Sequence, residues 1–443
     1  VFQGTMRFLN QILRGSKNPG STSDSPRSAP DIRPPTPQHP TRTLWLLGVL
    51  HAFTHIYHVA LVPLYLPIQR DLGLATVDQA TFLQTLLMLA YFVPSYAMGI
   101  LADRLDRRLL LSLGLAINGL GFVGLALAPN FLCALASVFV AGIGGSFYHP
   151  SATAMIARLF PIGTGRALGL VGIGAGAGFF LSPIYTGWRA EMSGWRAPVL
   201  ELGLLGVAMA VLFYFVAGAQ SSSPSSARSA RRTPMFPSRA LWAWFVLASV
   251  LFGLRDFAGS GMGSLSSLFM QKVHEFGLHE TGLTLSAIFL AAVISNPFFG
   301  GLSDRGRIRW TCLVLGIAAL LVAWFPHVSP QWFVPMFALY GFFFMASYPM
   351  IEAALMESVP DAVRGRIYGF FITVGGLIGN LSHWQVGERV NAMGASAGQA
   401  QLYLPIYAGL ALLIVISLAG LPCLHAIRKR ESPQHHANAP SPV

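Results

Sequence analysis

The stretch Gly99-Ile-Leu-Ala-Asp103-Arg104-Leu-Asp-Arg107-Arg108 decides the fold of this sequence, because the chain repeats it about two hundred residues later. The second copy reads Gly300-Gly-Leu-Ser-Asp304-Arg305-Gly-Arg307-Ile-Arg309. Both copies lie in short gaps between long apolar runs. A further pair repeats at nearly the same offset, with Gly165-Arg166 matched by Gly365-Arg366. The repeats predict two related halves.

The composition predicts a membrane protein. Hydrophobic residues make up 53% of the 443 residues and charged residues only 10%, whereas soluble domains carry about 25% charged residues. Apolar runs of roughly 20 residues recur along the chain, and each can cross about 30 Å of hydrocarbon as a helix. We expect an all-α integral membrane protein with twelve transmembrane helices in two pseudo-symmetric six-helix halves. The expected spans are residues 44–66, 79–101, 109–128, 131–157, 166–189, 198–218, 241–271, 280–302, 310–326, 330–357, 366–387 and 401–424.

Polar segments divide the chain into five expected parts. These are a disordered cytoplasmic tail (1–42), an N-terminal six-helix bundle (43–219), a cytoplasmic linker (220–239), a C-terminal six-helix bundle (240–424) and a second cytoplasmic tail (425–443). The first tail and the linker are rich in Pro, Ser and Arg, a composition with too little apolar surface to build a core.

The positions of the basic residues predict the orientation. The chain has a formal net charge of +12 and 29 Lys and Arg residues. With both termini in the cytoplasm, 23 of them fall on the cytoplasmic side and five on the other, while Arg255 alone lies within a span. This is the positive-inside bias of membrane proteins, so the charge does not indicate nucleic-acid binding. We expect a multi-pass protein of the cell membrane, in a bacterium the inner membrane.

Several classes of function are disfavoured. The cysteines Cys133, Cys312 and Cys423 lie far apart inside apolar runs, without the spacing of a disulfide framework or metal site. The phosphate-binding pattern Gly-x-x-x-x-Gly-Lys-Ser/Thr is missing from the sequence, which argues against ATP as the energy source. No nucleophile and base stand at a recognisable spacing. We therefore expect a transporter rather than an enzyme and no bound cofactor, while a sensor that kept a transporter scaffold stays open.

The twelve spans, two halves and doubled Gly-x-x-x-Asp-Arg loops resemble the major facilitator superfamily. The resemblance implies alternating access, small-molecule substrates in a lipid bilayer and a monomer. It also implies a cytoplasmic gate, whose residues here are Asp103, Arg104, Arg107, Asp304 and Arg305. The first copy departs from the family pattern with Asp106 in place of Gly, and the second copy is shortened. Plain positive-inside chemistry is the alternative explanation of these loops.

The fifth span resembles the motif of the antiporter branch of this superfamily. Its expected helix-packing residues are Gly169, Gly178, Ser182 and Pro183. Small residues let helices approach closely, and proline can bend a helix in a gating region. Packing alone is the alternative explanation.

Short patterns in spans 1, 4 and 7 resemble fosmidomycin-resistance-type exporters within the superfamily. They are His51-x-x-x-His55-x-Tyr57, Phe147-Tyr148-His149-Pro150-Ser151 and Phe269-Met-Gln-Lys272. In the superfamily spans 1, 4, 7 and 10 line the central cavity, so the resemblance places Tyr148 and His149 there.

Ionisable residues inside spans are costly and are therefore functional candidates. In span 1, His51, His55 and His58 fall on one helical stripe, with Tyr65 on the same side. Their simplest alternative role is hydrogen bonding between helices. The expected substrate-binding residues are Arg255, His55, His58, Tyr65, His149 and Tyr148, and the expected proton-coupling residues are Asp256, Glu352, His51 and His55.

A buried guanidinium attracts an anionic group, and histidines and acids exchange protons. The sequence therefore predicts export of a small organic, anionic or amphiphilic compound by proton antiport. The competing hypothesis is transport of a divalent metal or metal chelate, because His51 and His55 at four-residue spacing can share an ion, with His58 or His149 completing its shell.

Overall fold

The computed structural model describes residues 40–102, 105–160, 162–217, 235–304, 306–359 and 363–437. The expected N-terminal tail and most of the linker lie outside these ranges, as do the gate residues Asp103, Arg104 and Arg305. Every regular element in the described part of the chain is a helix.

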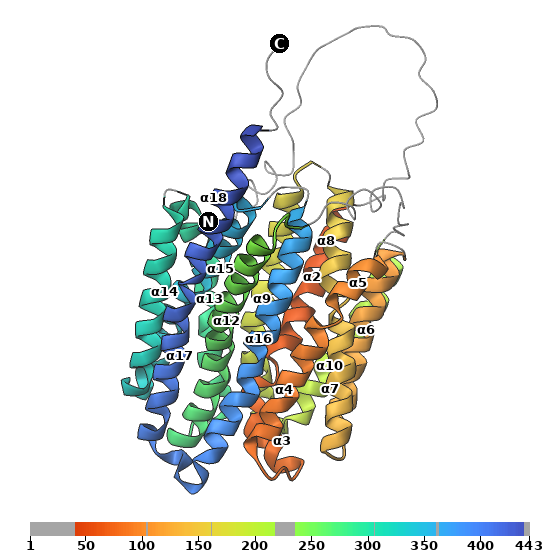
Figure 1. The fold of residues 1–443 in the computed structure, drawn as a ribbon. Coiled ribbons are helices and arrows are strands. Elements are labelled where there is room, and N and C mark those ends of the chain that lie inside the picture. The colour runs from red at the N-terminus through yellow and green to blue at the C-terminus, as the bar shows by residue number, and fades with distance from the viewer. Residues whose placement is uncertain are drawn as a thin grey trace, which may run out of the picture. The chain divides into compact units, whose positions relative to one another are not determined.

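Twelve membrane-length segments follow one another along the chain, as expected (Figure 1). Four of them are broken into two helices, one further segment ends in a short 3-10 turn and another is preceded by one. The six segments of the first half are α2 (Pro40–Val59) with η1 (Val62–Leu64) and α3 (Tyr65–Asp71), α4 (Val77–Phe92) with α5 (Ser95–Ala102), α6 (Arg107–Ala126), α7 (Phe131–Gly145) with α8 (Tyr148–Leu159), α9 (Thr164–Ser193) and α10 (Arg196–Val216). The six segments of the second half are α12 (Arg239–Val273), α13 (Leu278–Ser303), α14 (Arg307–Trp324) with η2 (Phe325–His327), α15 (Phe333–Glu357) preceded by η3 (Pro330–Trp332), α16 (Arg364–Ala392), and α17 (Leu404–Ser417) with α18 (Gly420–Ala437), which follow η5 (Gly394–Gly398) and η6 (Ala400–Tyr403).

Ten of the segments in the described residues are long and apolar enough to cross a membrane by themselves. The two others are α4–α5, which is interrupted at residues 93–94, and α16, which carries four charged residues. Each has helical neighbours from both halves, which contribute to the burial of its polar groups. We call the end of the bundle that holds the loops after α5 and α13 the basic end, and the opposite end the far end.

The loop that departed from the family pattern forms a helix cap. Asp106 precedes α6, and its carboxylate accepts a hydrogen bond from the backbone N–H of Leu109 at 3.1 Å. In the second loop Gly306 takes the same place before α14, with φ of 157°. The side chain of Asp106 therefore satisfies a backbone donor of the first helical turn, while the shorter second loop uses glycine.

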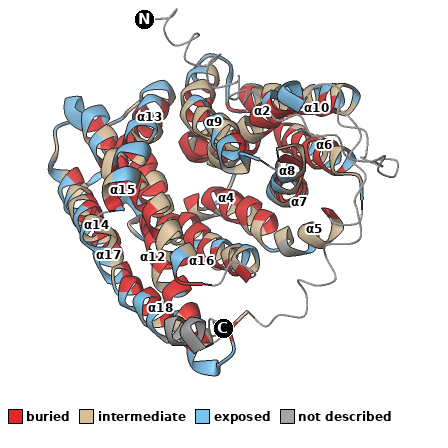
Figure 2. Cartoon of the chain, turned by 90° about the horizontal axis from the view of Figure 1, so that it is seen from above, coloured by how far each residue is buried: buried red, intermediate tan, exposed pale blue. Residues whose placement is uncertain are grey.

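The two halves meet along two pairs of helices. Helix α4 of the first half packs on α16 of the second, and α9 packs on α13. Seen from above, α2 and α10 lie with α9 in one half, while α14 and α17 lie outermost in the other (Figure 2). The twelve-helix arrangement predicted from the sequence is confirmed.

Helix α9 of the first half packs closely on α2. Gly174 and Gly178 lie so near the carbonyls of Gly48 and Ala52 that an added Cβ would be 1.9 and 2.3 Å from these oxygens. One turn on, the Ser182 hydroxyl donates to the Ile56 carbonyl at 2.8 Å. Three residues at four-residue spacing on each helix thus bring the backbones together.

The same helix touches the second half at its far-end portion. A Cβ on Gly282 of α13 would be 2.0 Å from the Pro183 carbonyl, and one on Gly187 would be 2.2 Å from the Leu278 carbonyl. Gly178, Ser182 and Pro183 therefore lie at tight contacts. At Gly169 nothing lies within 4 Å of the position of an added Cβ, so its packing role stays a prediction.

Hydrogen bonds between the halves gather toward the far end. The Ser267 hydroxyl of α12 donates to the Val62 carbonyl at 2.7 Å, and the Thr85 hydroxyl of α4 donates to the Asn380 carbonyl at 2.9 Å. The Gln271 side chain donates to the Pro63 carbonyl at 3.1 Å. These bonds hold the far end closed in this conformation.

The C-terminal helix extends into the expected polar tail. The last apolar span was expected to end at residue 424, and α18 continues as a helix to Ala437. The polar residues that follow the apolar run therefore extend the helix.

Candidate functional site

Four histidines gather near the middle of the first half. His55 lies midway along the segment Pro40–Asp71, and its Nε2 is 3.1 Å from Nε2 of His51, one turn earlier. Its other nitrogen, Nδ1, is 3.2 Å from Nδ1 of His58. His149, from the start of α8, lies edge-on to His51 with ring centroids 5.2 Å apart. The structure thus brings together all four histidines that the sequence singled out.

One backbone carbonyl determines the order of protons along three of these rings. His51 Nδ1 lies 3.0 Å from the Val171 carbonyl, which can only accept, so Nδ1 carries the hydrogen. In the neutral cluster His51 Nε2 then accepts from His55 Nε2–H, and His55 Nδ1 accepts from His58 Nδ1–H. The chain ends at His58 Nε2, a buried atom for which the described part of the chain provides no hydrogen-bond partner.

Aromatic rings enclose this cluster. Tyr148 stacks on His51 at 4.8 Å, and Phe179 of α9 lies 4.3 Å from the His55 ring. Tyr91 of α4 meets His58 edge-on at 4.5 Å. The Tyr148 hydroxyl donates to the Leu47 carbonyl at 2.8 Å, so this predicted binding residue presents its ring, not its hydroxyl, to the cluster.

The second half carries a buried ion pair at the middle of α12. Arg255 is only 2% exposed, and its Nη2 and Nε lie 2.7 and 3.1 Å from Oδ1 of Asp256. The guanidinium carbon lies 4.0 Å from the centre of the Tyr348 ring, a favourable cation–π distance. Nη1 is 3.5 Å from the Ser347 hydroxyl. The charge of Arg255 is therefore already neutralised by its neighbour in sequence.

Two glycines of α16 leave room for the acid. A Cβ on Gly375 would be 2.6 Å from Oδ2 of Asp256, and one on Gly379 would be 2.9 Å from its Cβ. Glu352 lies one turn from Tyr348 on α15 and has the Tyr368 hydroxyl of α16 within hydrogen-bonding reach. Arg255 also interacts electrostatically with Glu352. The predicted group of Arg255, Asp256 and Glu352 is thus assembled from α12 and α15 and closed by α16.

Tyr65 takes a different position from the other predicted binding residues. It is fully buried, and its hydroxyl lies 2.9 Å from Ser264 and 3.5 Å from Nδ1 of His383 in the other half. Ser264 itself lies 2.6 Å from that nitrogen. Tyr65 therefore contributes to the far-end contact between the halves in this conformation.

The gate residue Asp304 makes its ion pair within the second half. Asp304 is 70% exposed on its side chain and lies 3.2 Å from Arg307. Arg307 also pairs with Glu357 at the end of α15, and Arg428 of α18 approaches the same carboxylate at 3.8 Å. Arg107 of the first loop also takes part in an interaction. The gate across the halves stays a prediction.

Sequence reasoning missed the residues that support the ion pair. Tyr348, Ser347 and Gly375 carry no charge, and they lie about 90 to 120 residues from Arg255 in the sequence. The one available signal was the position of Tyr348, one helical turn before Glu352. Phe179 and the Val171 carbonyl were missed for the same reason, since neither has a pattern of its own.

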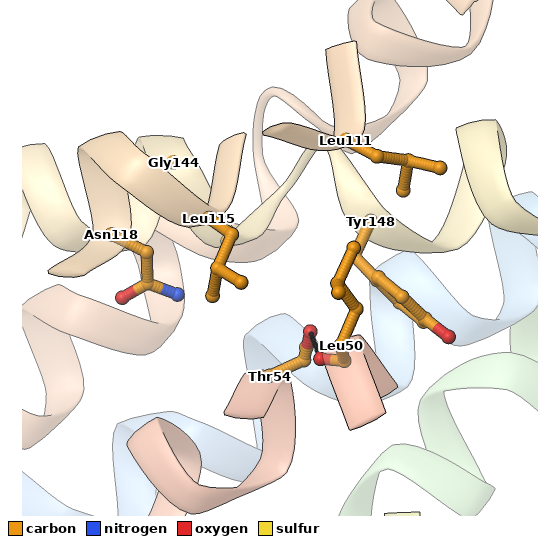
Figure 3. A pocket seen from close by; sticks show the side chains of 8 residues that line it. Leu50, Thr54, Leu111, Leu115, Asn118, Gly144 and Tyr148 are labelled. Atoms are coloured by element: carbon orange, nitrogen blue, oxygen red, sulfur yellow. Dashed lines mark hydrogen bonds between the residues drawn. The ribbon is translucent and has the colours of Figure 1, made fainter. Parts of the chain in front are cut away.

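A small internal cavity borders the histidine cluster, because Tyr148, which stacks on His51, is one of its lining residues. It has a volume of about 10 Å³ between α2, α6, α7 and α8, and Figure 3 shows Leu50, Thr54 and Asn118 among its lining residues. This is room for about one water. The buried Oδ1 of Asn118 has no partner in the described residues, so a water here would satisfy it. We assign no transport role to this cavity.

The sequence profile of the Major Facilitator Superfamily matches residues 44–382. The chain belongs to the major facilitator superfamily. It is a membrane transporter of this group rather than an enzyme. The resemblance stated from the doubled loops is therefore confirmed, while the closer likeness to fosmidomycin-resistance-type exporters stays a prediction.

Relatives of this superfamily member are distant but span most of its length. It is 22% identical to the uncharacterized transporter YfnC of Bacillus subtilis, over 87% of this chain and 97% of that one. It is 23% identical to the quinolone resistance protein NorA of Staphylococcus aureus, over 82% and 90%. The multidrug resistance protein MdtG of Proteus mirabilis is 27% identical over 61% and 69%.

Two solved structures show the same fold. One is a bacterial homolog of the human lysosomal transporter Spinster, in an inward-facing and unoccupied conformation. It has a TM-score of 0.70 and 19% identity, and the match covers 92% of this chain and 99% of that one. The nucleoside transporter NupG has a TM-score of 0.69 and 16% identity, over 86% and 99%.

Proposed function

We propose that this transporter exports a small organic anion or anionic amphiphile in exchange for protons, and that the exchange takes place at the Arg255–Asp256 pair. The observation that carries the proposal is the burial of this pair at the middle of α12. Charged residues near the middle of a spanning helix are expensive and mark substrate or proton pathways.

The physical basis of the exchange is that Arg255 cannot remain unpaired. Leaving a buried charge without its partner costs about 3–5 kcal/mol. Arg255 keeps its charge at all working pH values, so either the Asp256 carboxylate or an anionic substrate must face it. A carboxylate or phosphonate substrate that takes the donors of the guanidinium therefore displaces the Asp256 carboxylate.

Release of the substrate lets Asp256 return to Arg255, so the transporter is never left with an unpaired buried cation. The emptied transporter then carries a proton back on Glu352, the proton acceptor next to the pair. Proton and substrate thus occupy the transporter in turn, as exchange requires. Tyr348 and Ser347 hold the guanidinium in place during both states.

The direction and orientation are part of the proposal. The relatives NorA and MdtG are named for drug resistance, and a further relative, 25% identical, is the multi-drug resistance efflux pump PmrA of Streptococcus pneumoniae. These names support export. The distribution of basic residues supports a cytoplasmic location of the basic end, so that the closed far end would face outward. The substrate would then bind from the cytoplasm, before the two halves rotate relative to one another and open the far end.

A thermal-shift screen tests the substrate class. Purified wild type is heated with carboxylates, phosphonates and uncharged analogues, because a ligand that binds only the folded state raises Tm. We expect anions to stabilise wild type and to lose this effect in Arg255→Gln. Arg196→Gln is the matched control, since Arg196 also pairs with an aspartate, Asp71, but at the exposed far end. Equal stabilisation of wild type and Arg255→Gln by every ligand would contradict the proposal.

A further inference from the structure

The histidine cluster has a geometry that the proposed exchange does not use. Within the described residues, His51, His55 and His149 each offer one ring nitrogen, and these three atoms lie within 4.8 Å of one another. The two nearest, Nε2 of His51 and Nε2 of His55, are 3.1 Å apart. We propose that these three histidines bind one divalent transition-metal ion of the Zn²⁺ class, with one coordination position left open.

The distance between His51 and His55 fits such an ion, and His149 must move closer, because the three ligand atoms are spread over up to 4.8 Å. Zn–N bonds of about 2.0–2.1 Å at tetrahedral angles place two ligand nitrogens about 3.3 Å apart. His51 and His55 need only a few tenths of an ångström of adjustment from their present separation of 3.1 Å. Imidazole nitrogens are the preferred donors of Zn²⁺ and its neighbours among the first-row divalent metals.

The surroundings of the ligands also fit. Metal-binding histidines usually donate their second N–H to a carbonyl or another acceptor, which fixes the ring. His51 does this through Nδ1 to the Val171 carbonyl. His55 Nδ1 faces His58 Nδ1 at 3.2 Å, so with an ion bound to Nε2 of His55, His55 donates and His58 accepts. The ion thus replaces the hydrogen between His51 and His55, and the proton order of His55 and His58 reverses.

The open position follows from the exposure of the third ligand. His51 and His55 are partly buried under Tyr148 and Phe179, whereas His149 is exposed. A three-histidine site of this kind leaves a fourth position for water or for a donor atom of another ligand. This position lies on the accessible side of the cluster, where an organic chelator could complete the shell. The inference does not depend on the exchange at Arg255.

Isothermal titration of the full-length protein in detergent with ZnCl₂ tests the site. The chain has 12 histidines, so the expected result is one tight equivalent above any weak binding. His55→Gln should lose that equivalent. His58→Gln should weaken it by about 10- to 100-fold, the usual effect of removing a group that orients a ligand. His327→Gln, an exposed histidine at the far end, is the matched control and should bind as wild type does.

X-ray absorption of the zinc-loaded protein gives a second readout. We expect three or four nitrogen or oxygen neighbours at about 2.0–2.1 Å in wild type. The proposal is overturned if wild type binds no tight equivalent, or if His55→Gln binds zinc as tightly as wild type. Monodisperse elution and an unchanged Tm of His55→Gln show that a loss of binding does not come from misfolding.

Discussion

At the scale of single residues, the two halves of the protein stabilise their buried ionisable groups in different ways. In the first half, three histidines satisfy one another in a chain that begins at the Val171 carbonyl. In the second half, a full ion pair is buried, with Tyr348 against the cation. The histidine chain can remain neutral, whereas the ion pair requires both charges. This difference makes the ion pair the better element for proton exchange.

The space around Asp256 gives a sharp test of the pair. Gly375→Ala places a methyl group 2.6 Å from Oδ2 of Asp256, so the carboxylate must move away from Arg255. We expect gradient-driven transport to fall at least several-fold and Tm to drop, with overpacking costing about 1–3 kcal/mol. Gly369→Ala on the same helix meets nothing within 4 Å and should transport as wild type does. Equal transport by both variants would show that the position of Asp256 is unimportant.

His274, between α12 and α13, gives a pH-dependent prediction. Burial lowers its pKa below the usual value, and its ring lies against Phe269 and Phe333. The unfolded chain then binds a proton at higher pH than the folded one, so this contribution to stability is complete above about pH 6.5 and is lost as the pH falls. We expect Tm to fall between pH 7 and pH 5, and His274→Gln to reduce that fall. An unchanged pH dependence in His274→Gln would show that other groups cause it.

At the scale of elements, α9 determines how the first half packs and how it meets the second. Its glycines face α2 over one portion and α13 over the next. Since lipid tails are as apolar as the helices, close backbone contact and hydrogen bonds are what hold such helices together. A helix that touches both halves in this way is well placed to transmit a rotation of one half to the other.

Substitutions at two glycines of α9 distinguish the effect of helix packing on stability from the effect of intrinsic helix propensity. Gly178→Ala would place its Cβ 2.3 Å from the Ala52 carbonyl oxygen, and we expect a loss of about 1–3 kcal/mol of stability. Gly176→Ala lies on the same helix with nothing within 4 Å, and it should be neutral or slightly stabilising, because alanine favours helix. Thermal unfolding of both variants measures the difference. The same Tm for both would show that α2 and α9 do not pack as described.

The sequence allowed the spans and the doubled loops to be predicted because hydropathy and repeats are local patterns. It also brought out the charged and histidine side chains, since ionisable groups in apolar runs are conspicuous. It did not reveal that Arg255 pairs with Asp256 or that Tyr65 bonds Ser264. Those facts depend on which way each side chain points and on partners up to some two hundred residues away.

At the scale of the whole molecule, the halves are fastened at the far end by buried hydrogen bonds. The Tyr65 hydroxyl, Ser264 and His383 form one connected group across the interface. The Tyr65 hydroxyl has these partners only while the halves are closed there, and opening must replace them with water. A hydrogen bond of this kind contributes about 0.5–1.5 kcal/mol, enough to bias the balance between two conformations without fixing it.

Removal of the Tyr65 hydroxyl tests whether these hydrogen bonds hold the far ends of the two halves together. Tyr65→Phe keeps the buried ring but deletes the contact with Ser264 at 2.9 Å. We expect the population open at the far end to rise several-fold, measured from distances between spin labels placed on the exposed residues Gly73 and Glu275 in Tyr65→Phe and wild type. Unchanged distance distributions would show that Tyr65 does not hold the halves together.

The exchange of a proton for a substrate at Arg255 and Asp256 is tested most directly in proteoliposomes with an imposed pH gradient. The measurement is the accumulation of an anion found in the thermal-shift screen, by wild type, Asp256→Asn and the control Asp71→Asn, which changes an exposed ion pair. We expect the gradient to drive accumulation in wild type and in Asp71→Asn. In Asp256→Asn the gradient should have no effect, while exchange of labelled for unlabelled anion continues. Gradient-driven accumulation by Asp256→Asn at the wild-type level would contradict the account.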